Sequence, residues 1–435
     1  MHRSAARRTS LAVLMAVNIL NFYDRQLVGA LTEPIRKEFS MSDAQIGLIG
    51  TAFIWLCALA GLPLGRVADT ASRRKLLAAG MLVWSALTGL AAAAVNYPML
   101  LLSRLGFAVG EAVVAPAATS WIGDLFPAAE RSRALAVFML GLPVGGAMSY
   151  FFSGPVAQAY GWRAAMLLAA APAVVLIPLL LRLQEPLRGA AEAPREISGQ
   201  PRMRTILRIP TMWWIIASGA LLNFNTYAIS MFLPAFLSRV HRLSLAGSGM
   251  ATGAVIAAGG ALGFLIAARL GDRAVRTRSD GRLLSAASAS LMAAPFAYFG
   301  IGAASVSAAI PLIAVAYGLL NSYYGLVYAA IQDIVAPALR GRAMAVYFLA
   351  MYLCGASFGP LVTGKLSDLA ARRAAHAAGA TAVTEAFKAV GLEQAMLIIP
   401  VLSLMLAIVL YGGSRTIAAD MLRREAPVPA GLYAR

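Results

Sequence analysis

Long stretches of the chain carry no charged residue, and short charged segments separate them. A bilayer core about 30 Å thick needs roughly 20 apolar residues per helix, so each of these stretches can cross a membrane. The uncharged stretches are residues 44–65, 76–103, 134–162, 164–181, 209–238, 243–268, 343–364 and 394–414. The pattern predicts a polytopic helical membrane protein.

Further membrane-spanning segments complete the set. The uncharged stretch 283–332 is long enough for two helices, which a Gly/Ala/Ser turn near residues 300–307 divides. Segments near residues 10–32 and 98–122 are apolar but include charged side chains. The total is twelve segments, which predicts an all-α membrane protein.

The composition supports this class. Hydrophobic residues make up 60% of the chain and charged residues only 13%, whereas a soluble domain carries about 25% charge. A soluble enzyme, a disordered protein and a secreted disulfide scaffold are therefore excluded. The two cysteines lie inside apolar stretches, and the three scattered histidines form no metal-binding pattern.

The net charge of +18 reflects membrane topology and not nucleic-acid binding. With the N-terminus in the cytoplasm, 26 of the 37 Lys and Arg residues fall on the cytoplasmic side and nine on the outer side. This asymmetry places both termini in the cytoplasm. We expect a multi-pass protein of a bacterial inner (plasma) membrane.

The longest internal loop is rich in Arg, Glu and Pro and divides the chain into six segments plus six. The predicted units are an N-terminal bundle (1–183), a cytoplasmic linker (184–208), a C-terminal bundle (209–416) and a cytoplasmic tail (417–435). A longer outer excursion, 365–393, carries most of the outer charge.

The two halves resemble each other in sequence. Leu20-Asn21-Phe22 recurs as Leu222-Asn223-Phe224. The sequence after segment 8 repeats that after segment 2, which places Asp272 and Arg276 where Asp69 and Arg73 stand. Arg131-Ser-Arg133-Ala-Leu-Ala-Val-Phe likewise matches Arg340-Gly-Arg342-Ala-Met-Ala-Val-Tyr. Such a duplicated half is common in transporters, whose substrate site lies between the repeats.

The loop between segments 2 and 3 resembles the signature loop of the major facilitator superfamily. It contains Gly65, Asp69, Arg73 and Arg74 in the order G-x-x-x-D-x-x-x-R-R. The resemblance implies two six-helix bundles around a central cavity lined mainly by segments 1, 4, 7 and 10. It also implies that Asp69 stabilises a cytoplasmic gate between the halves when the carrier opens outward, and Arg131 and Arg133 could join this gate.

Within the superfamily the chain is most similar to the spinster family, mainly in its N-terminal half. The matching motifs are Asn21-Phe-Tyr-Asp24-Arg25-Gln26, Arg104-x6-Glu111-Ala112, Asp124-Leu-Phe-x4-Arg131-Ser-Arg133 and Glu185-Pro-x-Arg188-Gly189. This resemblance implies a proton-coupled carrier of sphingolipids or lysophospholipids.

Only two acidic residues, Asp24 and Glu111, lie well inside predicted spans. Charges at such depths are costly, so they normally face the bundle interior and serve a function. Arg104 precedes Glu111 by two helical turns, and its depth in the bilayer matches that of Asp24. We expect Asp24 or its neighbour Arg25 to meet segment 4 near Arg104, with Glu111 deeper in the cavity. Asp24 and Glu111 are the predicted proton-coupling pair, with Arg25 and Arg104 as counter-charges; a permanent ion pair that only orders the bundle is the alternative.

Polar side chains form stripes on three segments. In segment 10 they recur at i, i+4, i+7 and i+11, which is one helical face. The stripes comprise Asn18 and Asn21, Asn223 and Tyr227, and Tyr317, Asn321, Tyr324 and Tyr328. Amphipathic aromatic groups suit a large, partly apolar substrate. Hydrogen bonding between helices is the other interpretation of the same residues.

Other functions are less consistent with the sequence. It contains no phosphate-binding Gly-rich loop, so we expect no ATP-driven transport and no cofactor, with a proton gradient as the driving force. The expected partners are protons, a small amphipathic or lipid substrate and membrane lipids, and we expect a monomer that binds no nucleic acid. The alternatives are a proton-coupled organic-anion or multidrug carrier and, more distantly, a non-transporting membrane sensor.

Overall fold

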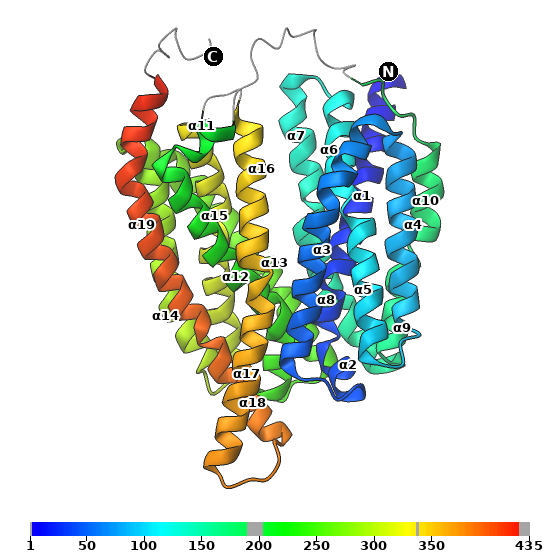
Figure 1. Ribbon diagram of the computed structural model, residues 1–435, viewed down its shortest axis with the longest axis vertical. Helices are drawn as coiled ribbons and strands as arrows, with labels where there is room; N and C mark the ends of the chain where they lie inside the picture. The colour runs from blue at the N-terminus through cyan, green and yellow to red at the C-terminus, as the bar shows by residue number, and fades with distance from the viewer. Residues whose placement is uncertain (1, 189–202, 336–338, 426–435) are drawn as a thin grey trace.

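The computed structural model describes residues 2–188, 203–335 and 339–425, which are almost entirely helical (Figure 1). The N-terminal half contains α1 (His2–Ala30), α2 (Thr32–Glu38), α3 (Asp43–Thr70), α4 (Arg73–Ala91), α5 (Tyr97–Glu111), α6 (Val114–Leu125), α7 (Ala128–Met139), α8 (Gly141–Tyr160), α9 (Trp162–Ala170) and α10 (Ala173–Arg182). The C-terminal half contains α11 (Met203–Leu207), α12 (Pro210–Arg239), α13 (Leu245–Thr277), α14 (Gly281–Ile301), α15 (Val306–Ile334), α16 (Arg340–Met351), the π-helical segment η2 (Tyr352–Ala356), α17 (Phe358–Ala377), α18 (Glu385–Met396) and α19 (Ile398–Glu425).

All twelve predicted membrane segments are helical, and several consist of two helices in line. Segments 4, 5 and 6 are α5–α6, α7–α8 and α9–α10, and segment 11 is α16, η2 and α17. Ten stretches of the described chain are long and apolar enough to cross a membrane. They do not include α1 and α4, whose sequences carry several charged side chains.

Two differences from the predicted boundaries are clear. The excursion 365–393 is a helical hairpin of α17 and α18, and α19 continues to Glu425, past the predicted start of the tail. Most of the predicted linker and the last ten residues of the tail lie outside the described residues.

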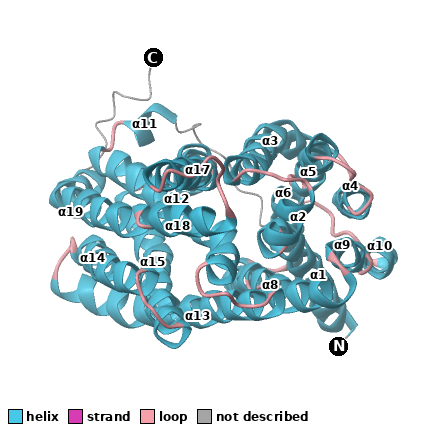
Figure 2. Cartoon of the chain, turned by 90° about the horizontal axis from the view of Figure 1, so that it is seen from below, coloured by secondary structure: helices cyan, strands magenta, loops and turns pink. Residues whose placement is uncertain are grey.

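The start of α1 and the end of α19 lie at one end of the bundle, here called the terminal face; the opposite end is the far face (Figure 1). Seen from the far face, the halves meet where α3 packs on α17 and α8 packs on α13 (Figure 2). One hydrophobic core contains residues of both halves, such as Leu31 and Met41 with Leu233 and Phe236. A second core is built almost wholly from the N-terminal half.

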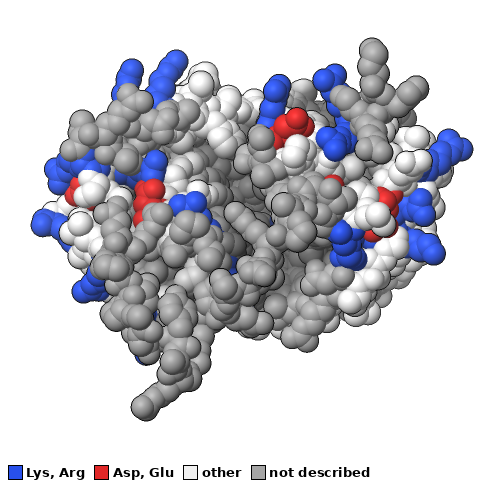
Figure 3. Space-filling model, turned by 90° about the horizontal axis from the view of Figure 1, so that it is seen from above, with Lys and Arg blue, Asp and Glu red and all other residues white. Residues whose placement is uncertain are grey.

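Contacts along α3 show that the halves separate toward the terminal face. A Cβ atom added at Gly47 would lie 2.3 Å from the carbonyl oxygen of Pro360 in α17. Gly61 and Gly65, farther along α3, have nothing within 4 Å of such an atom. The space-filling surface is correspondingly hollowed between the two halves at the terminal face (Figure 3). The protein is therefore closed at the far face and open at the terminal face.

The packing of α3 on α17 at the far face depends on the absence of a side chain at Gly47. Gly47→Ala is expected to push α3 from α17, because overpacking costs about 1–3 kcal/mol. Spin-label distances between the far ends of α3 and α17 should shift to longer values, whereas Gly61→Ala should leave them unchanged. Identical distance distributions in both variants would contradict the packing at the far face.

Candidate functional site

The centre of the molecule contains a buried ion pair between α1 and α5. The Arg25 guanidinium pairs with the Glu111 carboxylate at the last residue of α5, and the two side chains are 14% and 3% exposed. Arg25 also donates a hydrogen bond to the Tyr227 hydroxyl of α12 at 3.4 Å. Its guanidinium carbon lies 5.1 Å and 5.3 Å from the ring centres of Phe22 and Phe53. Arg25 thus connects the charged N-terminal half to the C-terminal half.

Asp24 and Arg104 lie inside the N-terminal half and form no ion pair with each other among the described residues. Asp24 is fully buried, and neither of its carboxylate oxygens has a hydrogen bond of normal geometry, although the Trp84 indole of α4 lies near enough to stabilise its charge. Arg104 donates to the Met166 sulfur at 2.9 Å and lies over the Phe107 ring. The charge of Arg104 attracts the Asp24 carboxylate and that of Glu111 repels it. The carboxylate is therefore in a weakly compensated environment, where its charge is costly.

Segments 1 and 4 meet through two adjacent residues of segment 1. Asp24 is near enough to Arg104 of segment 4 for their charges to attract each other, and Arg25, the residue after Asp24, pairs with Glu111 of the same segment. Successive residues on a helix point about 100° apart, so Asp24 and Arg25 face different surroundings. Asp24 faces the interior of its own half, whereas Arg25 faces the space between the halves.

The predicted polar stripes separate into buried and partly exposed members. Asn18, Asn21, Asn223 and Tyr317 are buried. Asn18 donates to the Phe138 carbonyl at 2.8 Å, and Asn223 donates to the Gly219 carbonyl and the Met351 sulfur. For these two asparagines the hydrogen bonds are those of helix packing.

The partly exposed members belong to an aromatic wall in the C-terminal half. Tyr227, Tyr324 and Tyr328 are all partly exposed, and the Tyr324 hydroxyl donates to the Asn223 side-chain oxygen at 3.4 Å. The rings of Tyr324 and Tyr328 are 5.6 Å apart. Asn321 is partly exposed too, but its side chain donates to the Tyr317 carbonyl of its own helix.

Sequence reasoning missed Tyr352 in this wall. Its ring lies 6.4 Å from that of Tyr227, and it begins the π-helical segment η2. Single π-helical turns are rare and often occur at functional sites. The sequence signal that could have found it is the i, i+4 spacing of Phe348 and Tyr352, which places both rings on one face of a regular helix.

At the terminal face, Arg73 holds the N-terminal half together. Its fully buried side chain pairs with Asp124 and with Glu185, and it donates to the Pro186 carbonyl at 2.8 Å. Arg74 donates to the Leu183 carbonyl at 3.0 Å. Both arginines therefore bind the end of their own half in this conformation.

Glu185 is held as an anion at this site. Partial burial alone would raise the pKa of its carboxyl group, but hydrogen bonds from the Ser72 hydroxyl, the Arg73 backbone and side chain and the Arg74 backbone lower it to about 2. The carboxylate is therefore ionised throughout the physiological pH range.

The other predicted gate residues are less informative. Nothing would contact a side chain at Gly65, and Arg133 is exposed. The side chains of Asp69 and Arg131 lie outside the described part of the structure. Their gating role stays a prediction.

The repeat alignment also needs correction. Arg73 begins α4, whereas Arg276 lies in α13, the counterpart of α3. The structural counterpart of Arg73 is Arg282 near the start of α14, and it pairs with Asp333 as Arg73 pairs with Asp124. Both pairs are separated by 51 residues. The sequence register shifts at this point mainly because α13, with 33 residues, is longer than α3, with 28.

A second ionic cluster, which sequence reasoning missed, closes the far face. Arg239 at the end of α12 pairs with Glu33 at 2.6 Å and with Asp43 at 2.7 Å, and all three side chains are buried. Asp43 also accepts from Ser367, and Asp368 accepts from the backbone nitrogens of Asp43 and Ala44. The helix N-terminus of α3 is thereby held by a carboxylate from α17.

Two six-helix halves that meet at one face, part at the other and enclose a charged pair are the architecture of a secondary transporter. Residues 14–360 match the Major Facilitator Superfamily, and the chain belongs to this superfamily of transporters, which are not enzymes.

Its relatives include both spinster proteins and an efflux pump. The chain is 32% identical to an MFS-type efflux pump of Mycolicibacterium smegmatis, over 82% of this chain and 84% of that protein. It is 29% identical to protein spinster homolog 3 of Mus musculus, over 82% of this chain and 74% of that protein. The predicted resemblance to the spinster family is confirmed.

A solved structure supports the fold. It is described as a bacterial homolog to the human lysosomal transporter Spinster in an inward-facing and unoccupied conformation, and it matches with a TM-score of 0.85 and 25% identity. The match covers 95% of this chain and 98% of the solved one. The predicted all-α fold of twelve membrane helices in two bundles is confirmed.

Proposed function

We propose that the chain is a proton-coupled secondary transporter that moves an amphipathic lipid-like substrate, a lysophospholipid or a sphingoid lipid, by alternating access. The observation that carries this proposal is that the two walls of the site between the halves differ in chemistry. The N-terminal wall provides the Arg25–Glu111 pair, and the C-terminal wall provides the tyrosines around Tyr324. A charged head group suits the first wall and a hydrocarbon chain suits the second.

Proton coupling acts through the ion pair. In this conformation Glu111 neutralises Arg25. Protonation of Glu111 removes that partner and frees the guanidinium to bind an anionic head group, with the bidentate geometry that Arg forms with phosphate. Asp24, buried beside Arg104 without a hydrogen bond of normal geometry, is the second protonatable group in this scheme.

Alternating access exchanges the closed and open ends. The far-face cluster around Arg239 breaks when the far side opens, and the Asp69 loop then closes the terminal side. The terminal face is the cytoplasmic side, which agrees with its excess of Lys and Arg (Figure 3). The transporter works as a monomer in a bacterial inner membrane, is driven by the proton gradient and needs no cofactor.

A second candidate function is efflux of organic anions or drugs. The relative of Mycolicibacterium smegmatis named as an efflux pump supports it. Both functions use the same ion pair, and they differ in the ligand that contacts the aromatic wall.

Uptake competition distinguishes the two substrate classes. Proteoliposomes should accumulate a labelled lysophospholipid, and an unlabelled phosphorylated sphingoid lipid should compete while a small organic acid should not. Tyr324→Ala should raise KM about tenfold, because it removes an apolar contact worth about 1.5 kcal/mol. Tyr298→Ala is the control, since that ring is 56% exposed on α14. Competition by small acids or drugs alone would favour the second function.

A further inference from the structure

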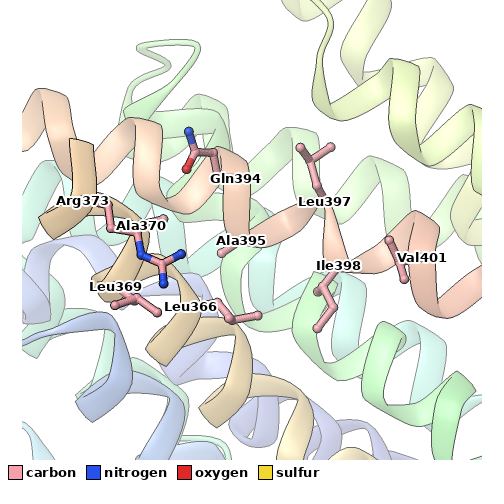
Figure 4. A pocket seen from close by; sticks show the side chains of 9 residues that line it. All are labelled: Leu366, Leu369, Ala370, Arg373, Gln394, Ala395, Leu397, Ile398 and Val401. Atoms are coloured by element: carbon pink, nitrogen blue, oxygen red, sulfur yellow. The ribbon is translucent and has the colours of Figure 1, made fainter. Parts of the chain in front are cut away.

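We propose that a groove between α17 and the α18–α19 junction binds an anionic glycerophospholipid of the membrane leaflet at the far face. The groove has a volume of about 300 Å³. Its walls include Leu366, Leu369 and Arg373 of α17 on one side and Gln394 and Val401 on the other (Figure 4). It lies away from the central site and does not depend on the proposed function.

The groove lies where α17 leaves the membrane. Asp368 accepts hydrogen bonds from the backbone nitrogens of Asp43 and Ala44, so this part of α17 is level with the first turn of α3. The α17–α18 hairpin projects beyond this level (Figure 1). The groove therefore extends across the boundary between the acyl chains and the head groups.

The part of the groove farther from the α17–α18 hairpin suits a hydrocarbon chain. Leu366, Leu369 and Val401 are 36%, 45% and 54% exposed. These side chains are apolar and open to the surroundings of the bundle. Leu366 precedes Asp368 on α17 and so lies on its membrane side, where the surroundings are lipid tails, whereas Leu369 lies at the boundary. A lipid chain lying in the groove covers them.

The part of the groove nearer the α17–α18 hairpin provides the charge that selects the head group. Arg373 is one turn beyond Leu369, is exposed, and has no ion-pair or hydrogen-bond partner in the described structure. Figure 4 shows its guanidinium extending toward the side chains of Leu366 and Leu369. No acidic residue lines the groove, so an unneutralised cation faces it. A lipid phosphate with a net negative head group complements this charge.

Photo-cross-linking tests the proposal without a transport assay. The purified full chain is incubated with phosphatidylglycerol or phosphatidylcholine that carries a diazirine on one acyl chain, and labelled peptides are mapped by mass spectrometry. Phosphatidylglycerol should label the peptides that contain Leu366–Leu369 and Leu397–Val401, and label them about fivefold more than phosphatidylcholine, since one basic side chain near a membrane surface adds about that factor.

Two variants with the same change of charge separate the site from general attraction. Arg373→Ala should remove the preference for phosphatidylglycerol, and Arg372→Ala should retain it, because Arg372 is exposed but does not line the groove. A thermal unfolding profile of each variant verifies that it is folded. Equal labelling by both lipids in the wild-type chain, an equal effect of both variants, or no label in the groove would overturn the proposal.

Discussion

Glu111→Gln is expected to abolish substrate-dependent proton movement and to reduce proton-driven accumulation at least about tenfold, the effect of ~1.4 kcal/mol. Glutamine has nearly the shape of glutamate and can still accept a hydrogen bond from Arg25, but it neither titrates nor neutralises the guanidinium. The variant therefore resembles the protonated state permanently. Counterflow, in which labelled and unlabelled substrate exchange without a gradient, should persist.

The control for Glu111→Gln is Glu130→Gln. Glu130 is an exposed carboxylate on α7, so its neutralisation changes the net charge equally without touching the site. Proton movement and accumulation are compared in the same proteoliposomes, with an internal pH dye and a labelled substrate. Unchanged coupling in Glu111→Gln would remove this residue from the mechanism.

Arg239→Ala is expected to open the far face. The substitution leaves the buried Asp43 carboxylate without an ion-pair partner among the described residues, whereas Glu33 keeps its pair with Arg36. Removing one member of a buried ion pair costs about 3–5 kcal/mol, and opening the far side rehydrates both carboxylates and relieves that cost. The population should shift by a factor of roughly a hundred or more toward conformations open at the far face.

Spin-label distances between the far ends of α3 and α17 measure this shift, and transport should fall with it. Arg278→Ala serves as the control. Arg278 forms an exposed pair with Asp280 at the terminal face, and such pairs contribute about 1 kcal/mol or less. A far face that stays closed in Arg239→Ala would show that helix packing alone holds it.

Much of the fold was predictable because it depends on composition and periodicity. Uncharged stretches of membrane length identify the spans, and the recurrence of short motifs identifies the two halves. The intramembrane charges were also identifiable, since Asp24 and Glu111 are the acidic residues well inside the predicted spans. The helix breaks within segments 5 and 6 lie at Gly141 and Pro172, residue types that bend or end helices, whereas the break in segment 4 at Ala112–Val113 has no such residue.

The site was predictable only in part, since side-chain direction depends on helix rotation. Adjacent residues Asp24 and Arg25 point into different environments, so the sequence could not show which one meets Glu111. The stripe on segment 10 has the right period, but Tyr317 is buried against α13 while Tyr324 is partly exposed. The far-face cluster joins Glu33 and Asp43 to Arg239, which lies about 200 residues further along the sequence, and nothing in the sequence pattern pairs them.

Proton flux in proteoliposomes that contain the wild-type chain measures coupling through the Arg25–Glu111 pair. An internal pH dye is followed while a lysophospholipid, and then a phosphorylated sphingoid lipid, is added. We expect a substrate-triggered pH change that is absent with empty liposomes and lost in Glu111→Gln. Substrate transport without any pH change in correctly folded and oriented protein would contradict proton coupling through the Arg25–Glu111 pair.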